Sequence, residues 1–417
     1  MGTAIEVIAI DVSDEAIACS KNHTQKTMLI LSHQQTLISI LKPFPRMRHF
    51  ITSGTSKSPY VSIIIVNYGK GWLARCLPSL VATQYARSRL EIIVVDNASG
   101  DDLASIKGLL AEVSLIRLDR NVGYANAVNI GIENSSGEYV AVLNNDVFVA
   151  PDWLNRLLNI LERDENVAAV CPRKKSLLMN QILDGCGGAL NILGQGWDRG
   201  ESEVDVGQYS DFAEVTHPSG AIFLTRRKLI REFGFFLNPD FFMLIEDVDF
   251  GLRCWKAGYK VVYTPDCVVY HARSPLLGGL NERNFYFYTK NLLAMMFEVF
   301  DLSLFVRLFP ILVETQLAQA FYLLYFHKKS HAIPSVLKAV KDFLFSLRLY
   351  SGRRVRIARI SDRDILSKFS RSLVIYEEGR SHETLIRLFL SANNLYVRLV
   401  LRAQPIKDII YFGKSPT

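Results

Sequence analysis

The amino-acid sequence predicts an α/β protein: a mainly parallel β-sheet with helices on both faces, followed by an α-helical C-terminal region. From Val61 to Cys171, apolar runs of strand length alternate with segments of helical spacing. The runs are almost continuously apolar, so both faces of the sheet are expected to be covered. Four of the runs end in polar residues, and beyond residue 284 large apolar side chains recur among scattered charges.

Composition and charge narrow the class of protein. Of 417 residues, 49% are hydrophobic and 21% charged, which suits one or two buried cores and excludes a disordered or fibrous chain. The net charge of +7 permits phosphates, anionic lipid or nucleic acid as partners. Six cysteines never form Cys-x-x-Cys, so no zinc site or disulfide framework is indicated, and a reducing cytoplasm is expected. No secretory signal pattern begins the chain.

Three regions are expected. Residues 1–58 form an N-terminal extension of unclear structure, 59–283 the α/β domain, and 284–417 a helical, amphipathic and basic region. Within the domain, the expected strands are the apolar runs Val61–Val66, Glu91–Val95, Val113–Leu118, Tyr139–Leu143 and Val167–Cys171. The expected helices are Leu73–Thr83, Tyr124–Glu133, Trp153–Glu162 and Val248–Ala257. Two further apolar runs are Ala221–Thr225 and Cys267–Tyr270.

Polar residues follow each of the first four strands. They are Asn67-Tyr68-Gly69, Asp96-Asn97-Ala98-Ser99, Asp119 to Tyr124, and Asn144-Asn145-Asp146. Any one of these segments is explained by turn or N-cap chemistry. In a parallel sheet, however, ligands bind beyond the carboxyl ends of the strands. Four polar ends on one edge therefore predict a lined pocket.

Two later segments are also candidates for function. Gly185–Gly200 holds six glycines around Trp197 and Asp198, and this pattern fits either a mobile lid or acceptor loop, or a long surface excursion. Glu246, Asp247 and Asp249 open a predicted helix. Acidic residues there are favoured by the helix dipole alone. The apolar residues before them instead suggest a partly buried cluster, in which a raised pKa would suit a general base.

The motifs together resemble family-2 glycosyltransferases of the GT-A fold, and more narrowly their bacterial rhamnosyltransferase-like branch. The resemblance covers about half the chain, from Val61 to about His271. It is carried by residues 61–68, 91–99, 121–131, 143–146, 219–221 and 246–249. The first strand is not followed by Gly-x-Gly-x-x-Gly, which counts against a dinucleotide-binding dehydrogenase.

The resemblance implies a nucleotide-sugar donor and an inverting transfer. Asn67 and Asp96 would line the base and ribose pocket, and the segment from Asn121 to Asn129 would close over the nucleotide. The full set of implied donor-binding residues is Asn67, Tyr68, Asp96, Asn97, Asn121, Gly123, Tyr124, Asn129, Asn144, Asn145 and Gly220. The implied donor is dTDP-rhamnose, with a UDP-sugar as the main substitute. The acceptor would be a saccharide or a lipid-pyrophosphate-linked saccharide in surface polysaccharide assembly.

In the family, an Asp-x-Asp motif after the fourth strand binds a divalent cation. Here Asn144 replaces the first Asp, so Asp146 supplies the charge and His271 is a candidate second ligand for Mg²⁺ or Mn²⁺. An ordinary histidine is the alternative for His271. By resemblance, Asp247 is the general base and Glu246 orients the base or the acceptor. Asn144 also leaves open a non-catalytic scaffold protein of carbohydrate assembly with the same fold.

The C-terminal region suggests membrane association. Asn284–Phe300 and Leu302–Phe326 are apolar but carry charges, so helices in the membrane interface are favoured over a span. Basic residues follow, at 328, 329, 338, 341, 348, 353, 354, 356 and 359, and suit anionic lipid. The expected location is cytoplasmic, peripheral on the inner face of the plasma membrane. A soluble helical subdomain is the alternative, and nucleic acid is not expected because no reading motif accompanies the charge.

Overall fold

The computed structural model describes residues 58–69, 71–109, 112–272, 281–354, 358–375 and 383–411. The chain divides into two compact units, residues 1–55 with 178–180, and residues 56–177 with 181–417. The first unit lies almost wholly outside the described residues. The predicted N-terminal extension, residues 1–58, falls almost wholly outside them too. The second unit contains both the predicted α/β domain and the C-terminal region, which share one body.

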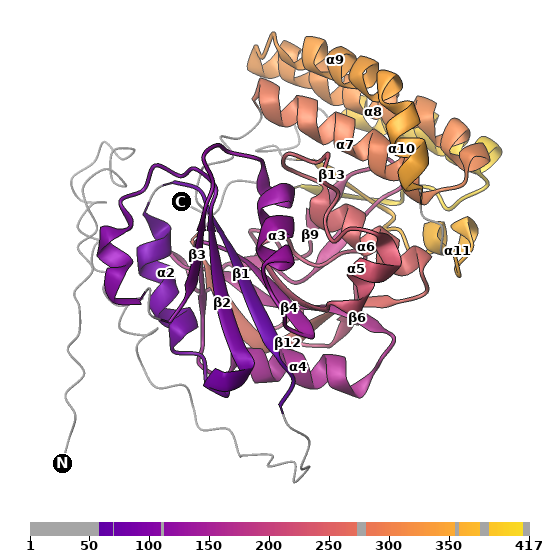
Figure 1. The fold of residues 1–417 in the computed structure, drawn as a ribbon. Helices are drawn as coiled ribbons and strands as arrows, with labels where there is room; N and C mark the ends of the chain where they lie inside the picture. Colours follow the sequence, from indigo (N-terminus) through magenta and orange to yellow (C-terminus); the bar gives the residue numbers. More distant parts are fainter. Residues whose placement is uncertain are drawn as a thin grey trace, which may run out of the picture. The chain divides into compact units, whose positions relative to one another are not determined.

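A ten-stranded sheet forms the centre of this unit (Figure 1). Its main strands run in the order β10-β12-β6-β11-β4-β1-β2-β3, with β5 paired to β12 and β7 to β6. The strands on the parallel side are β1 (Val61–Asn67), β2 (Leu90–Asp96), β3 (Ser114–Arg117) and β4 (Tyr139–Asn144). The others are β5 (Val147–Val149), β6 (Val167–Ser176), β7 (Leu183–Gly185), β10 (Ala213–Glu214), β11 (Ile222–Arg226) and β12 (Lys260–His271). The predicted mainly parallel α/β sheet is confirmed.

Two features of the sheet go beyond the sequence pattern. The run predicted from Ala221 is strand β11, which inserts antiparallel between β4 and β6. Strand β12 begins well before the predicted Cys267, and its register with β6 shifts between Thr264 and Val268. Pro265 lies at this shift, where a residue without an N–H is tolerated. Beyond this shift, β12 pairs with β5, the strand that follows β4 in the chain. His271, the last residue of β12, lies opposite Val147 of β5.

Helices cover both faces of the sheet because strand side chains alternate between the faces. Ile63 and Ile65 pack in one core with α2 (Trp72–Val81) and α4 (Trp153–Arg163). Ile64 and Val66 belong to the opposite core. The helices of that core include α3 (Tyr124–Glu133), α5 (Lys228–Phe233) and α6 (Glu246–Lys256). Short 3₁₀ turns are Arg87–Arg89 and Leu103–Leu109.

The glycine-rich segment is not a surface excursion, so that prediction is wrong, whereas a lid or acceptor loop stays a prediction. It forms the hairpin β8 (Gly188–Leu190) and β9 (Gly196–Asp198), and most of its residues are buried. A side chain at Gly188 would collide with the ring of His217. Its glycines therefore serve close packing.

The C-terminal helices form a layer beside α6 (Figure 1). They are α7 (Glu282–Val299), α8 (Leu302–His327), α9 (Ala332–Phe345), α10 (Leu347–Arg353), α11 (Asp362–Ser367) and α12 (Glu383–Tyr396), with a π-helical turn at Val397–Leu401. Strands β13 (Ser372–Ile375) and β14 (Asp408–Tyr411) pair in parallel. Most of the second half of α7 is buried within the protein, so its predicted place in a membrane interface is wrong. Among the described residues, Leu302–Phe326 is long and apolar enough to cross a membrane, with 44% of its apolar window buried.

Candidate active site

Side-chain hydrogen bonds join the carboxyl ends of β1, β2 and β4. Asn67 lies opposite Asp96 in the register of β1 with β2, and its Nδ2 donates to Asp96 Oδ1 at 3.2 Å. Asn145 donates from Nδ2 to Asn67 Oδ1 at 2.7 Å. Asn67 is fully buried, whereas Asn144 is half-buried. Predicted donor-side residues from three neighbouring strands are thus brought together.

Asn97 and Asn121 shape the loop that leads from β3 to α3. The N–H of Val122 donates to Asn97 Oδ1 at 2.9 Å, and the N–H of Gly123 donates to Asn121 Oδ1 at 2.9 Å. Asn97 Nδ2 also donates to Asn121 Oδ1 at 3.1 Å. The two amides therefore hold the loop in one course beside the strand ends.

Gly123 links this loop to the segment that precedes α6. Its φ is +88°, and a Cβ there would collide with the backbone carbonyl of Phe242. Glycine meets both requirements, because it tolerates positive φ and has no side chain. The carbonyl of Phe242 accepts a hydrogen bond from the N–H of Tyr124 at 2.7 Å. The predicted donor-side loop and the approach to the acidic helix are therefore in direct contact.

Tyr124 is the first residue of α3 and is close to Gly220. Its hydroxyl is 3.4 Å from the carbonyl oxygen of Gly220. Burial raises the pKa of Tyr124 well above its ordinary value, and the charges of Glu246, Asp247 and Asp146 add to the shift. All three carboxyl groups are thus close enough to this phenol to act on it electrostatically.

Asn129 and Tyr68, two other predicted donor-binding residues, differ in their surroundings from the residues at the strand ends. Asn129 accepts from the N–H of Leu237 at 3.0 Å and donates to its carbonyl at 2.7 Å. Its amide therefore fixes the backbone at Leu237. This contact is structural, whereas contact with the donor was predicted. Tyr68 is 41% exposed at the end of β1. Its ring is open to solvent.

The two predicted metal ligands are neighbours. His271 Nε2 lies 3.1 Å from Asp146 Oδ1, and Nδ1 lies 2.8 Å from Oδ2 of Asp184. Burial lowers the pKa of His271, but the charge of Asp184 and the hydrogen bonds to both carboxylates outweigh it and raise the pKa to about 9. Among the described residues, no group of three or more His, Cys, Asp or Glu side chains is arranged to hold a metal ion.

Lys174 extends this cluster towards β9. Its ammonium is 3.2 Å from Asp184 and 2.8 Å from Asp198, and its side chain is only 3% exposed. Asp198 Oδ2 also accepts from the hydroxyl of Ser219 at 3.1 Å. Lys174 and Asp184 are not among the residues predicted from the sequence. Lys174 follows the apolar run of a predicted strand, and this position could have indicated a buried ion pair. A buried lysine is stable only beside acidic groups.

A strained turn presents the acidic pair. Leu244 and Ile245 both have positive φ, at 70° and 72°, which is costly for large or β-branched side chains. Helix α6 begins immediately afterwards at Glu246. Asn291 of α7 is fully buried, and its Nδ2 donates to the carbonyls of Met243 and Leu244, each at 2.9 Å. The C-terminal region thus stabilises the turn, a role that local sequence spacing did not indicate.

The two carboxyl groups at this helix start differ in their surroundings. Burial, then the charge of Asp247, raises the pKa of Glu246 to about 8. Burial also raises the pKa of Asp247, although His217, whose Nδ1 lies 3.8 Å from Asp247 Oδ2, opposes the shift. A Cβ on Gly220 would be 2.8 Å from Asp247 Oδ2, so this glycine leaves room for the carboxylate. Asp249 is fully buried and pairs with Arg253 at 2.8 Å, which gives it a structural role.

Comparisons with known proteins agree with this architecture. Residues 62–234 match the family model "Glycosyl transferase family 2". An uncharacterized glycosyltransferase of Haemophilus influenzae is 25% identical over 51% of this chain and 65% of its own length. Glycosyltransferase AglE of Haloferax volcanii is 25% identical over 55% of this chain and 72% of its own.

A pre-mycofactocin glycosyltransferase of Mycobacterium tuberculosis is 30% identical over 56% of this chain and 47% of its own length. This chain thus spans 65% of the length of the Haemophilus influenzae relative and 47% of that of the Mycobacterium tuberculosis relative. Among solved structures, S. aureus TarS 1-349 in complex with UDP-GlcNAc gives a TM-score of 0.49 at 14% identity, over 70% of this chain and 83% of that one. A likeness that remote adds nothing to the assignment. Residues 62–234 of this chain are thus similar to the glycosyltransferases of family 2.

Proposed function

We propose that the chain is a nucleotide-sugar-dependent glycosyltransferase that inverts the anomeric centre. The observation that carries the proposal is the placement of Glu246 and Asp247 directly after a strained turn, with the Asp247 carboxylate against Gly220, whose carbonyl lies 3.4 Å from the Tyr124 hydroxyl. A general base near an acceptor and a metal-binding carboxylate near a donor are the two parts that direct displacement needs.

The donor side is the edge formed by Asn67, Asp96 and Asn145. Asp96 accepts from a base N–H or a ribose hydroxyl, and the exposed ring of Tyr68 offers a face on which a base can stack. The loop held by Asn97 and Asn121 covers the nucleotide. We propose dTDP-rhamnose as the donor and a UDP-sugar as the substitute. The acceptor is a saccharide, free or linked to a lipid pyrophosphate.

Asp146 and His271 would hold a divalent cation once Nε2 of His271 loses the proton that a pKa of about 9 retains at neutral pH. Asp184 holds Nδ1 of His271, so that Nε2 faces Asp146, and this is how a second carboxylate commonly orients a metal-binding histidine. Mg²⁺ and Mn²⁺ accept such a partial set of ligands when phosphate oxygens and water complete it. When bound, the cation neutralises charge on the leaving pyrophosphate.

Asp247 is the general base. Its carboxylate takes the proton of the acceptor hydroxyl as that oxygen attacks the anomeric carbon and the nucleoside diphosphate leaves from the opposite face. Glu246, whose pKa of about 8 keeps it protonated at neutral pH, donates a hydrogen bond to the acceptor or to the base. A single base gives inversion, since no covalent intermediate is formed.

A transfer assay with a panel of nucleotide sugars tests the function. We expect release of nucleoside diphosphate from one donor class, with dTDP-rhamnose and UDP-sugars as the first candidates, and we expect EDTA to abolish it and Mn²⁺ or Mg²⁺ to restore it. Asn144 favours a second candidate, a carbohydrate-assembly scaffold with the same fold. Donor binding without turnover on any acceptor would favour the scaffold, and the absence of donor binding would contradict both functions.

Asn291→Ala should lower kcat with little change in the KM for the donor. The substitution removes two buried hydrogen bonds that hold the turn at Met243 and Leu244. Each is worth about 1 kcal/mol. Steady-state kinetics and thermal unfolding measure the two effects. Asn134→Ala is the matched control, because the exposed Asn134 follows α3 and its Nδ2 donates to the carbonyl of Ile130 in that helix at 2.8 Å. An unchanged kcat in Asn291→Ala would contradict the positioning role.

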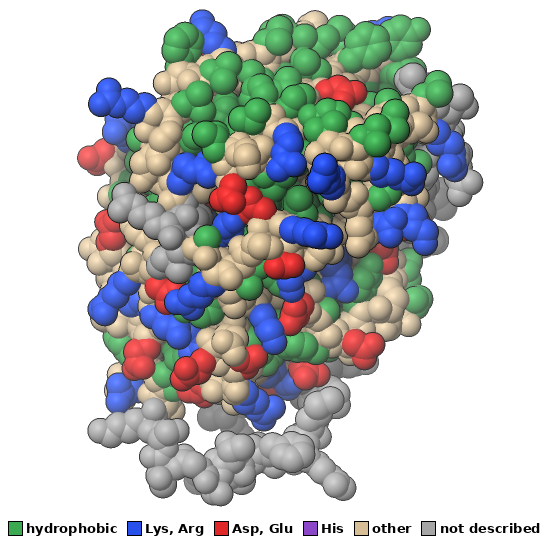
Figure 2. Space-filling view, turned by 90° about the vertical axis from the view of Figure 1, so that its right-hand side faces the viewer, with side chains coloured by type: hydrophobic (Ala, Val, Ile, Leu, Met, Phe, Trp, Pro, Cys, Tyr) green, Lys and Arg blue, Asp and Glu red, His purple; other side chains and the backbone are tan. Residues whose placement is uncertain are grey.

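The protein surface supports membrane association through the C-terminal layer. Figure 2 shows hydrophobic side chains gathered at one end of the molecule, above a zone of Lys and Arg. The large apolar side chains exposed in this layer are Leu302, Val306, Phe321, Tyr325, Leu337, Leu344, Phe345, Leu349, Leu388, Leu395, Leu399 and Val400. So many exposed apolar residues in one layer indicate an interaction surface.

Part of the predicted basic cluster contributes to this surface. Lys328, Lys329, Lys341 and Arg348 are exposed. By contrast, Arg353 pairs with Asp240, and Arg354 donates to carbonyls of α7, so both serve the fold. Arg356 lies outside the described residues. Cations beside an apolar surface suit anionic lipid, and we propose a peripheral location on the cytoplasmic face of the plasma membrane.

Flotation with phosphatidylserine-containing liposomes tests this location. The wild-type protein should float at low salt, and the double variant Phe345→Asp with Leu399→Asp should not, because both side chains are strongly exposed and would insert. Val206→Asp is the matched control, since Val206 is 80% exposed in the glycosyltransferase domain. Flotation of the double variant equal to that of the control would contradict the proposal.

A further inference from the structure

A second cavity lies on the far side of hairpin β8–β9 from Asp198. Its volume is about 550 Å³, within the range of about 300–1,000 Å³ usual for ligand pockets. Trp197, Tyr209 and Trp255 line it, together with Arg199 and Lys368. Three aromatic rings, two cations and the carboxylate of Glu214 therefore share one cavity.

The cavity is separate from the candidate active site, although one strand serves both. Neighbouring side chains of a strand point to opposite faces. In β9, Asp198 bonds Lys174 and Ser219, whereas Trp197 lines the cavity. The C-terminal segment completes the wall, since Ser370 lines it and its N–H donates to the carbonyl of Leu190 at 2.8 Å. This segment lies outside residues 62–234, so the cavity is not a feature of the family domain alone.

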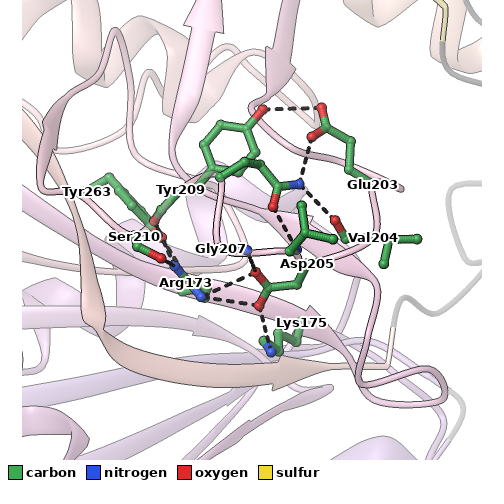
Figure 3. Close-up of polar contacts among 11 residues, drawn as sticks. Arg173, Lys175, Glu203, Val204, Asp205, Gly207, Tyr209, Ser210 and Tyr263 are labelled. Carbon is green, nitrogen blue, oxygen red and sulfur yellow. Dashed lines mark hydrogen bonds and ion pairs between the residues drawn. The ribbon is translucent and has the colours of Figure 1, made fainter.

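Arg199 is a half-buried cation whose guanidinium stacks on aromatic rings. Its guanidinium stacks over the ring of Tyr209 at 5.3 Å and over that of Tyr263 at 6.0 Å. Within the described ranges it forms no ion pair, whereas the nearby Arg173 pairs with Asp205 at 3.2 Å (Figure 3). A guanidinium held in this way has its hydrogen-bond donors available for an anionic ligand.

The aromatic wall is held in place before any ligand arrives. Asp205 is fixed by Arg173 and by Lys175, the latter at 2.7 Å (Figure 3). Arg173 also donates to the carbonyl of Tyr209 at 2.7 Å, and so does the hydroxyl of Tyr263 at 2.8 Å. On the opposite side, the ammonium of Lys368 lies 3.9 Å from the ring centre of Trp255. Such preorganisation reduces the entropic cost of binding.

We propose that this cavity binds an anionic sugar residue of a saccharide, with a carboxylate as the anion. Cations cover faces of Tyr209 and Trp255, so it is the edges of the rings that pack against apolar C–H groups of a sugar. Arg199 recognises the carboxylate with its planar, two-donor geometry. Lys368 also lines the cavity but pairs at 3.8 Å with Glu214, another lining residue, so Arg199 is the cation that the carboxylate would meet and Lys368 offsets the charge of Glu214. The site requires neither a donor nor sugar transfer, so a failure of the proposed catalysis would leave it intact.

Tryptophan fluorescence of the full chain tests the site, because Trp197 and Trp255 are two of only four tryptophans. Without any nucleotide sugar, a hyaluronan tetrasaccharide, which carries glucuronate, should give a saturable change. Neutral chitotetraose and inorganic phosphate should bind at least tenfold more weakly. Arg199→Gln should weaken tetrasaccharide binding about tenfold or more, because charge-assisted hydrogen bonds are lost.

Lys368→Gln provides a second variant whose side chain is exposed, so it tests the site even if Arg199→Gln fails to fold. It should weaken binding severalfold. Lys260→Gln is the matched control, since Lys260 also pairs with Glu214, at 3.4 Å, but does not line the cavity. Equal binding of the neutral and acidic saccharides, equal binding of phosphate alone, or an effect of Lys368→Gln no larger than that of the control would overturn the proposal.

Discussion

Asp247→Asn should reduce the rate of sugar transfer by about 10²–10⁴-fold, the usual contribution of a general base. The substitution keeps the shape of the side chain and removes its ability to take a proton. Room for the carboxylate beside Gly220 is unchanged, so binding of the donor should persist. Burial raises the pKa of Asp247, and the acid limb of the wild-type rate profile should therefore lie above the ordinary aspartate range.

Glu246→Gln is the matched control for Asp247→Asn. Glutamine resembles the protonated glutamic acid that a pKa of about 8 maintains, so transfer at pH 7 should fall by less than about tenfold. Stability should respond as well. Glu246 keeps its proton up to about pH 8 when folded but only to about 4.5 when unfolded. Its contribution to the free energy of unfolding is therefore complete below pH 4.5 and is lost as the pH rises through 8, and Glu246→Gln should remove that dependence.

Single-turnover kinetics and urea unfolding between pH 5 and 9 measure these effects. If Glu246→Gln loses as much activity as Asp247→Asn, the two carboxyl groups share the role of base and the assignment to Asp247 is wrong. Activity of Asp247→Asn near that of the wild type would contradict the mechanism altogether.

Lys174→Met should lower the free energy of unfolding by about 3–5 kcal/mol, the usual cost of leaving buried charges without their partner. Lys174 is 3% exposed and bridges Asp184 and Asp198, so its loss removes the cation beside Asp198 and leaves Asp184 with His271. Because Asp184 orients His271, the affinity for Mn²⁺ should also fall, by about 10–100-fold. Urea unfolding and calorimetric titration with Mn²⁺ give the two values.

Lys338→Met is the control for this substitution. Lys338 is 63% exposed and pairs with Asp342 within one helix, where such a pair contributes less than about 1 kcal/mol. If Lys174→Met costs no more than this control, the buried cluster does not stabilise the fold. A normal affinity for Mn²⁺ in Lys174→Met would show that Asp184 orients His271 without its help.

Much of the fold was accessible from local pattern. The strands β1, β2 and β4 were predicted within one residue of their observed ends, because continuous apolar runs bounded by Asn and Asp mark buried parallel strands. The convergence of Asn67, Asp96 and Asn145 followed from one rule, that parallel strands end on one edge. By contrast, glycine content misled the reading of Gly185–Gly200 as a surface excursion, since glycine also permits tight packing.

By itself, the sequence determined the mainly parallel sheet, its polar edge and the acidic start of α6, because all of these are properties of neighbouring residues and their period. Tertiary structure alone decided which charges meet. Lys174, Asp184 and Asp198 come from three strands, and Asn291 reaches the turn at Leu244 from a helix beyond the family domain. A buried charge or amide is stable only beside its partner, and that partner is chosen by packing between distant segments, which no local spacing records.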